Sequence, residues 1–310
     1  MTKQQFSPKI RLTLLAATLA ILAPSTHAWH AVGHMAVARI AVYRLNMTQE
    51  GRDTLNWATK LLNPLKQQCG EDKHPFTEAA EWPDKIKRQT WTSFNYWHFT
   101  NYEVLAPDYT PKEPILVQQN DIIQAITDIA AFLSSDPQPH KGVPPLLGQS
   151  LSLRQLIHFV GDIHQPLHVI NRYSNRFPEQ EGDLGGNRFK IQHYNVTYWN
   201  NLHWIWDHIF DQPFGVGPTI DIGSPLSDKD WIILSNFSQK VMNLHTYDDL
   251  KLQMMENSTL KDWADEGYKI ANSFSYDGIE FGKELPQEYI DKAIDIVNKR
   301  LRLGATGWLI

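Results

Sequence analysis

The chain has 310 residues, of which 42% are hydrophobic and 20% are charged, and its formal net charge is −5 at pH 7. This composition fits a globular protein with a large core, and the acidic balance excludes a protein that holds nucleic acid mainly by neutralising phosphates. Cys69 is the only cysteine, which excludes an intrachain disulfide and the zinc–thiolate sites.

The first 28 residues have the pattern of a secretory signal peptide. A basic segment with Lys3, Lys9 and Arg11 comes first, and the apolar stretch Leu12 to Ala23 follows. Thr26 and Ala28 then provide small residues at positions −3 and −1 of a cleavage site. We therefore predict cleavage after Ala28, a mature chain that begins at Trp29, and a secreted or periplasmic location. The alternative is an uncleaved anchor, but the apolar stretch is short for a membrane span and no later stretch is long enough. We expect no membrane insertion.

The rest of the chain, 29–310, is predicted to form a single, mainly α-helical domain. Residues 91–99 are interpreted as an aromatic, extended segment, and the alternation over 188–196 predicts one arm of a short β-hairpin. A central helix is predicted to end at Gln165, before Pro166. Apolar periodicity and capping residues predict the other helices, at about 29–45, 48–62, 77–89, 115–135, 198–211, 228–245, 259–274 and 286–303. The fold class is therefore all-α.

The central helix carries the main chemical signal. His158 and Asp162 are separated by four positions and therefore share one helix face, and His168 follows just past the predicted end of the helix. An imidazole and a carboxylate in apolar surroundings are typical ligands of a divalent metal ion. For this segment alone, the alternative is a buried His–Asp pair joined by a hydrogen bond.

A second helix repeats the same pattern. His203 and Asp207 have the i, i+4 spacing in another apolar, aromatic segment, and with His168 they bring the ligands above the number that one zinc ion normally takes from protein. The sequence therefore predicts a cluster of metals. His164, about two turns beyond His158, is predicted to orient one of the ligands. Further candidate ligands lie in apolar, structured contexts: His34, Asp84 and His98.

Taken together, these motifs resemble the S1/P1 family of tri-zinc, single-strand nucleases. They occur in the family's order: Trp29 with His34, Trp82-Pro83-Asp84, Trp97-His98-Phe99, His158-x-x-Gly161-Asp162 continuing to His168, Asp183-x-Gly-Gly-Asn187 and Asn201-Leu-His203-x-x-Trp206-Asp207. The resemblance implies a helical fold shared with zinc phospholipase C. It also implies hydrolysis of P–O3′ bonds in single-stranded RNA and DNA and in 3′-nucleotides, leaving 5′-phosphates. The alternative activity is that of a zinc phospholipase C.

The resemblance also implies three zinc ions and the residues that hold them. The three implied ligand sets are Asp84, His98, His158 and Asp162; His168, His203 and Asp207; and the amine and carbonyl of Trp29 with His34 and Asp162. Asp162 would bridge two metals and orient the attacking water, which makes it the predicted catalytic residue. The amine of Trp29 is free only after cleavage at Ala28, so the predicted signal peptide and the predicted ligand coincide.

Two further residues are predicted to contact the substrate. The resemblance implies that Phe99 stacks on a base, with ordinary core packing as the alternative, and that Asn187 bonds to a base edge. Asp183 is expected to shape its glycine-rich loop. The chain departs from the family at Asn101, where better-known members carry an acidic residue. We expect a monomer.

Overall fold

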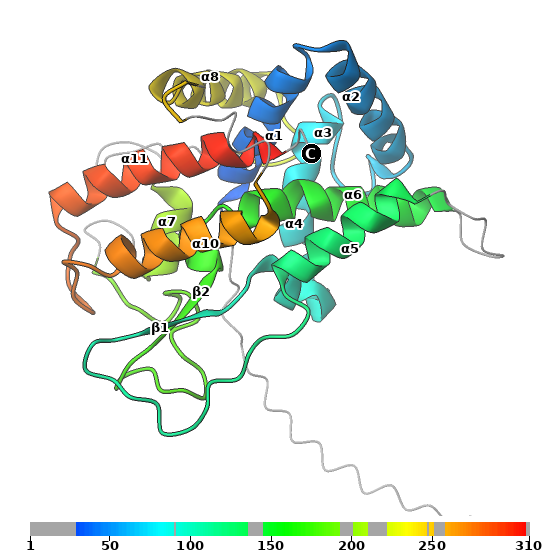
Figure 1. Cartoon of the computed structure of the whole chain (residues 1–310). Helices are drawn as coiled ribbons and strands as arrows, with labels where there is room; N and C mark the ends of the chain where they lie inside the picture. Colours follow the sequence, from blue (N-terminus) through cyan, green and yellow to red (C-terminus); the bar gives the residue numbers. More distant parts are fainter. Residues whose placement is uncertain are drawn as a thin grey trace, which may run out of the picture.

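The structure is a computed structural model that describes residues 29–89, 91–135, 145–192, 201–209, 222–246, 248–250 and 258–307. The predicted signal peptide lies outside these residues, as do parts of the predicted hairpin and of the predicted helix 198–211. The prediction of a mainly helical fold is confirmed (Figure 1). In the part of the chain that the structure describes, no helix combines the length and the apolar character needed to cross a membrane.

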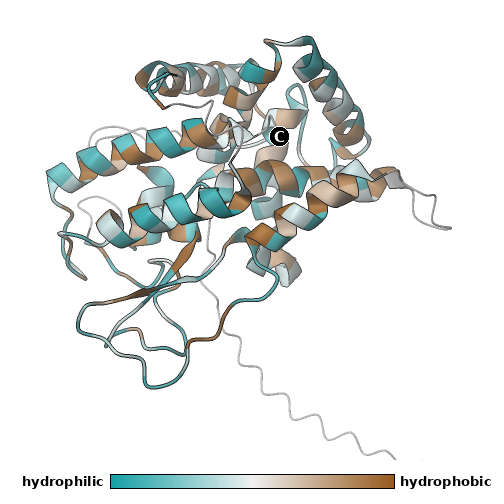
Figure 2. Cartoon of the chain, viewed as in Figure 1, coloured by the Kyte–Doolittle hydropathy of each residue, from teal (hydrophilic) through white to brown (hydrophobic). Residues whose placement is uncertain are grey.

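Helix α6 (Pro145–Asp162) lies at the centre of the helical arrangement (Figure 1). Most of the other long helices contact it: α1 (Ala31–Leu45), α2 (Gln49–Leu62), α5 (Ile122–Ser134) and α11 (Gln287–Gly304), together with the short α4 (Trp82–Arg88). Figure 2 shows hydrophobic residues along α5 and α6, and long hydrophilic stretches along α10 (Leu260–Ile270) and α11. The helix with the predicted metal ligands is therefore enclosed by its neighbours.

Helix α1 is buried on most of its circumference, because nearly every turn carries Val, Met, Ile or Ala. It packs against α8 (Asp228–Leu244) on one side and α6 on another. The helix also carries His34, whose side chain is only 1% exposed. An apolar helix thus brings one imidazole into the core next to α6.

Several helices begin where a capping residue predicts. Thr48 Oγ1 accepts a hydrogen bond of 3.0 Å from the Gly51 amide, which confirms the predicted start of α2. Side chains cap four other helices in the same way: Asp121 for α5, Asn201 for α7 (Leu202–His208), Ser227 for α8 and Thr259 for α10. The first turns of these helices are therefore determined by local sequence.

Three segment predictions were wrong in detail. The segment 77–89 is not one helix, because a turn of 3₁₀ helix (η2, Ala79–Glu81) separates α3 (Pro75–Glu78) from α4. The segment 91–99 is not extended but forms a 3₁₀ helix, η3 (Thr92–His98). The helix expected over 115–135 begins only at Ile122, one residue after its Asp121 cap.

The central helix ends at Asp162, three residues earlier than predicted. Pro166 is the cause, because a residue that precedes proline is disfavoured in the helical conformation, and Gln165 indeed has an extended backbone with φ −83° and ψ 117°. The chain then makes a tight turn and a second 3₁₀ helix, η4 (Pro166–His168). His168 is thereby turned back toward the end of α6.

A two-stranded parallel sheet, which the sequence did not predict, lies beside this turn. Strand β1 (Tyr102–Leu105) pairs with β2 (Ile170–Tyr173), with Tyr102 opposite Ile170 and Leu105 opposite Tyr173. The predicted hairpin is only partly described, and its described part forms a single antiparallel bridge between Lys190 and Asn201. Strand β1 follows η3, and β2 follows η4. The sheet therefore holds the chain after His98 beside the chain after His168.

Candidate metal centre

Asp162 lies at the meeting point of three histidine side chains that were predicted as ligands. Its Oδ2 is 2.9 Å from His98 Nδ1 and 3.2 Å from His158 Nε2, while its Oδ1 is 3.3 Å from His34 Nε2. The carboxylate is fully buried. Burial alone would raise the pKa of Asp162, but the nearby His158 and His34 hold that pKa well below its usual value. The residue is therefore a permanent carboxylate in contact with imidazoles from three elements.

The predicted side-chain ligands form three compact groups. In each group, one ligand atom from every residue lies within 4.8 Å of the others: His34, His158 and Asp162; Asp84, His98 and His158; and His168, His203 and Asp207. All of these residues are buried. The structure therefore brings together every side chain that was predicted as a metal ligand, with His158 and Asp162 near the junction of two groups.

Backbone carbonyls fix the orientation of three of the histidines. His158 Nδ1 donates to Ala80 O, His168 Nδ1 to His98 O, and His203 Nδ1 to Gly185 O, each at 2.7 Å. A carbonyl can only accept, so each Nδ1 carries a proton, and in the neutral ring Nε2 keeps the lone pair. This arrangement is the one that metal-binding histidines use, because it points the bare nitrogen at the metal.

The Nε2 atoms of His168 and His203 face each other at 3.0 Å. Both rings donate through Nδ1, so two lone pairs meet across this distance, and burial lowers the pKa of His168, which disfavours a proton between them. Burial also raises the pKa of Asp207 well above its ordinary value, although Gln165 donates to it. A cation held by these three side chains would separate the two lone pairs by binding both, and it would stabilise the ionised form of Asp207.

His34 gives a second sign that the site fits a metal. Its Nδ1 has no hydrogen-bond partner among the described residues, and its Nε2 has only the 3.3 Å contact with Asp162 Oδ1, although both nitrogens are buried. Its ring stacks on that of His158, with 3.7 Å between centroids, and burial lowers the pKa of His34 to about 4. The ring is thus neutral at pH 7, with a lone pair available to a metal.

Gly161 allows this close packing. A Cβ at this position would lie 2.7 Å from His34 Nδ1, so any larger residue would displace the ring. The carbonyl of Gly161 also accepts a hydrogen bond of 2.8 Å from the indole Nε1 of Trp29, which is completely buried. The glycine of the central motif thus positions both His34 and the predicted first residue of the mature chain.

The residues predicted around the ligands have different roles. Asp183 is buried and accepts hydrogen bonds from the Arg172 amide and the Tyr276 hydroxyl, while its loop-shaping role stays a prediction. Phe99 is half-buried and lies directly after His98. Asn187 donates through Nδ2 to Leu184 O within its own loop, which leaves its side-chain oxygen for other partners.

The described contacts of His164 do not support its predicted role. Its Nδ1 hydrogen-bonds to Val160 O, and its ring packs against Trp263, so among the described contacts none orients a ligand. The neighbouring Gln165 contacts a predicted ligand instead, because its Nε2 donates to Asp207 Oδ1 at 2.8 Å while its Oε1 accepts from the Leu167 amide. Gln165 was not predicted as a site residue, although its place inside the central motif was a signal.

Lys87 was not predicted as a site residue either. This side chain is buried on α4, and its Nζ lies 3.8 Å from Asp84 Oδ1, one of the predicted ligand atoms. The i, i+3 spacing of Asp84 and Lys87 was visible in the sequence, but such pairs are usually exposed. A buried cation beside the ligands offsets part of their negative charge.

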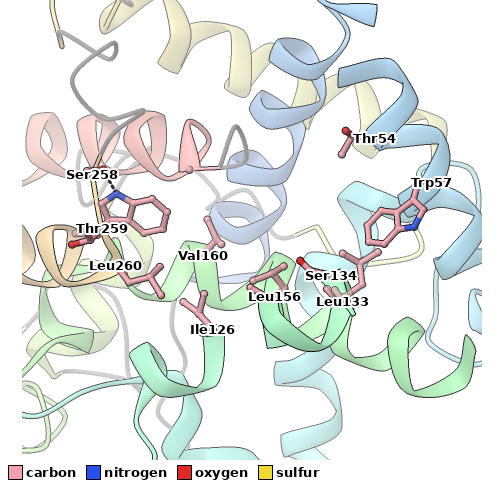
Figure 3. A pocket seen from close by; sticks show the side chains of 14 residues that line it. Thr54, Trp57, Ile126, Leu133, Ser134, Leu156, Val160, Ser258, Thr259 and Leu260 are labelled. Carbon is pink, nitrogen blue, oxygen red and sulfur yellow. Dashed lines mark hydrogen bonds between the residues drawn. The ribbon is translucent and has the colours of Figure 1, made fainter. Parts of the chain in front are cut away.

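A separate apolar pocket of about 610 Å³ lies on the opposite face of α6 (Figure 3). Leu153, Leu156 and Val160 form its wall along α6, and Trp57 of α2 and Trp263 of α10 contribute the largest side chains. The predicted metal ligands are not among the residues that line it. Helix α6 therefore has one face for the metal centre and another for apolar packing.

Residues 29–306 match the family model described as S1/P1 Nuclease. The chain belongs to the S1/P1 nuclease family. Curated relatives include Endonuclease 1 of Arabidopsis thaliana, which is 26% identical over 96% of this chain and 91% of the relative. Nuclease S1 of Aspergillus oryzae is 25% identical over 91% of this chain and 89% of the relative. Nuclease P1 of Penicillium citrinum is 25% identical over 59% and 58%.

Membership in the S1/P1 nuclease family establishes the general activity. The protein is a hydrolase that acts on phosphodiester bonds of nucleic acids, with a preference for single strands. The relatives named above are nucleases, and the alternative of a phospholipase C is not supported. The match also begins at residue 29, the predicted first residue of the mature chain.

Proposed function

We propose that this member of the family is a secreted or periplasmic enzyme that uses three zinc ions to hydrolyse P–O3′ bonds. Its substrates would be single-stranded RNA and DNA and 3′-nucleotides, and its products would end in 5′-phosphates. The catalytic domain would span 29–310 after cleavage at Ala28. The observation that carries the proposal is the approach of the His168 and His203 Nε2 atoms to 3.0 Å in a buried, carboxylate-lined site.

Zinc is the metal that best suits the donor set. Side-chain ligands from imidazole and carboxylate groups, without thiolates, are typical of hydrolytic zinc sites, whereas magnesium and calcium prefer oxygen ligands. The number three is supported by the three ligand groups. When bound, zinc ions supply Lewis acidity toward the phosphate ester and make water a better nucleophile at neutral pH.

The residues of the chain would position the reactants. Asp162, in contact with ligands of two groups, would hold the ions close together and accept a hydrogen bond from the attacking water. Trp29 would complete the third site through its free amine and carbonyl, next to His34. Phe99 would stack on the base of the nucleotide beside the metal centre, and the side-chain oxygen of Asn187 would accept a hydrogen bond from a base amine.

The test uses protein that begins at Trp29 and has been loaded with zinc. It is incubated separately with 3′-AMP, single-stranded DNA, RNA and phosphatidylcholine, and its metal content is measured by elemental analysis. We expect about three zinc ions per chain, inorganic phosphate from 3′-AMP and nucleic-acid fragments that end in 5′-phosphates. His74→Gln is the matched control, because His74 stacks on Trp231 away from the ligand groups. One zinc or fewer, or fragments that end in 3′-phosphates, would contradict the proposal.

A further inference from the structure

The helix η3 carries exposed aromatic side chains that lead to the metal centre. Among the described residues, four aromatic side chains are exposed, and two of them belong to this segment: Trp91 is 55% exposed and Tyr96 is 65% exposed. The other two, Trp57 and Phe132, lie on α2 and α5. Exposed aromatic side chains that gather on one segment indicate a binding surface, because single ones are ordinary and clusters are not.

The rings of this segment form two short runs. Tyr96 lies 6.2 Å from Phe99 between ring centroids, and Phe94 lies 6.2 Å from Trp91 and 4.7 Å from Trp97. We call Trp91, Phe94, Tyr96 and Phe99 the aromatic strip. Since Phe99 directly follows the predicted ligand His98, one end of the strip lies at the metal centre.

Hydrogen bonds hold the backbone at the end of the strip that lies next to His98. Gln118 Nε2 donates to Tyr96 O at 2.9 Å and to Phe99 O at 3.1 Å, which fixes the end of η3 against the loop before α5. A platform that is rigid before binding loses less entropy when a ligand stacks on it. The aromatic strip is thus prepared for a ligand.

The segment before the strip presents one exposed basic side chain. Between Asp84 and Glu103 the chain carries three basic residues and no acidic one, but Lys87 is buried beside Asp84 and Lys85 contacts Glu81. One of the three, Arg88, has a side chain that is 45% exposed, although it also contacts Glu81. Planar exposed rings beside basic residues are the features that proteins use to bind single-stranded nucleic acid.

We propose that the aromatic strip binds the bases of a single strand on one side of the bond that is cut, and gives the enzyme a preference for oligonucleotides over mononucleotides. This inference rests on the proposed function. A 3₁₀ helix rises about 2 Å per residue, so the strip extends about 14 Å from His98 to Trp91. A stacked strand advances about 3.4 Å per nucleotide, and that length therefore accommodates about four nucleotides.

The experiment compares zinc-loaded wild type with Tyr96→Ala, Trp91→Ala and the control Trp57→Ala. Trp57 is an exposed tryptophan too, but it lines the apolar pocket on the other face of α6 (Figure 3). KM is measured for 3′-AMP and for the octanucleotide dT8, and the Kd of a labelled phosphorothioate dT8 is measured by fluorescence anisotropy. We expect the ratio of the dT8 KM to the 3′-AMP KM to rise about tenfold in Tyr96→Ala and Trp91→Ala, with a matching rise in Kd. Trp57→Ala should match the wild type.

The outcomes separate this inference from the proposed function. If the wild type hydrolyses both substrates but the strip variants bind dT8 as tightly as it does, the strip is not a base-binding surface and the proposed function stands. If no substrate is hydrolysed while the strip variants still bind dT8 about tenfold more weakly, the proposed function fails and the binding surface stands. A change in oligomeric state by size-exclusion chromatography with unchanged dT8 binding would instead identify a protein interface and overturn the inference.

Discussion

His168 Nδ1 donates a hydrogen bond of 2.7 Å to the main-chain carbonyl of His98. One predicted ligand thus fixes the backbone of another, and the Thr100 amide returns a bond of 2.9 Å to His168 O. The pairing continues into β1 and β2. The small parallel sheet is therefore a support for the metal centre, which joins a ligand from η3 to a ligand from η4.

Asp162→Asn should reduce activity more than any other single change among the ligands. Its carboxylate contacts His34, His98 and His158, so the change weakens two of the ligand groups at once. We expect activity to fall by more than the roughly 100-fold that is typical when a residue hydrogen-bonded to a metal ligand is changed. We also expect fewer zinc ions per chain. The measurement is 3′-AMP hydrolysis with metal analysis, and Asp228→Asn, an exposed acid, is the control. A larger loss in His203→Ala than in Asp162→Asn would disprove the bridging role.

Gln165→Ala should weaken zinc binding at the group formed by His168, His203 and Asp207. Gln165 donates to Asp207 Oδ1, and without this bond the carboxylate is free to rotate away from the ion. Changes at such supporting positions typically reduce metal affinity about 10- to 100-fold. Titration against a competing chelator measures the affinity, and Gln124→Ala, on the exposed face of α5, is the control. Loss of affinity at all sites alike would indicate a general folding defect instead.

One extra alanine in front of Trp29 should remove one zinc ion and lower activity by orders of magnitude. The extra residue converts the amine into an amide, whose nitrogen has no lone pair for zinc at neutral pH. The side-chain ligands are unaffected, so folding should persist with reduced thermal stability. The two proteins are compared by metal content, melting temperature and 3′-AMP hydrolysis. Equal zinc content and equal turnover would show that the N-terminus is not a ligand.

The chelated protein should lose stability as the pH falls below about 6.5. Burial lowers the pKa of His34 to about 4 and that of His98 to about 3, so between these values and 6.5 the unfolded chain takes up protons that the folded chain does not. The contribution of these two histidines to the free energy of unfolding is therefore fully present above pH 6.5 and decreases as the pH falls toward 4. Burial alone would also lower the pKa of His158, but attraction to Asp162 raises it and offsets part of the effect.

Melting temperatures of the chelated protein between pH 7.5 and 4.5 test this expectation. His34→Gln has no titrating ring at this position and should show a shallower decrease. A melting temperature that rises as the pH falls would contradict the direction derived from the two histidines.

The side-chain ligands could be predicted from sequence because their chemistry is local and specific. The i, i+4 spacing of His158 and Asp162 places both on one helix face, and the same rule holds for His203 and Asp207, whose atoms lie 3.6 Å apart. The cost of burying polar side chains within apolar helices must be compensated by bound partners, so such residues indicate a site. The grouping of His34 with the residues of α6 could not be derived in this way, because it depends on tertiary packing.

Elements that depend on tertiary packing were also the ones predicted incorrectly. The aromatic residues of 91–99 favour a strand by propensity, yet Gln118 and the aromatic contacts hold this segment as η3. Strands β1 and β2 are each four residues long, too short for a clear alternation, and their pairing is not local. The role of Gln165 depends on Asp207, which lies 42 positions away.

The parallel sheet also determines when the metal centre can form. His98 and His168 are 70 positions apart, whereas His158 and Asp162 are neighbours on one helix. Local pairs form early in folding, and contacts between distant segments form late. An ion that binds early in folding can therefore be held only by ligands of a single helix. The complete set of ligands forms only after β1 and β2 have paired. A zinc-sensitive dye and far-ultraviolet circular dichroism, followed together during refolding, should show helix formation before high-affinity zinc uptake.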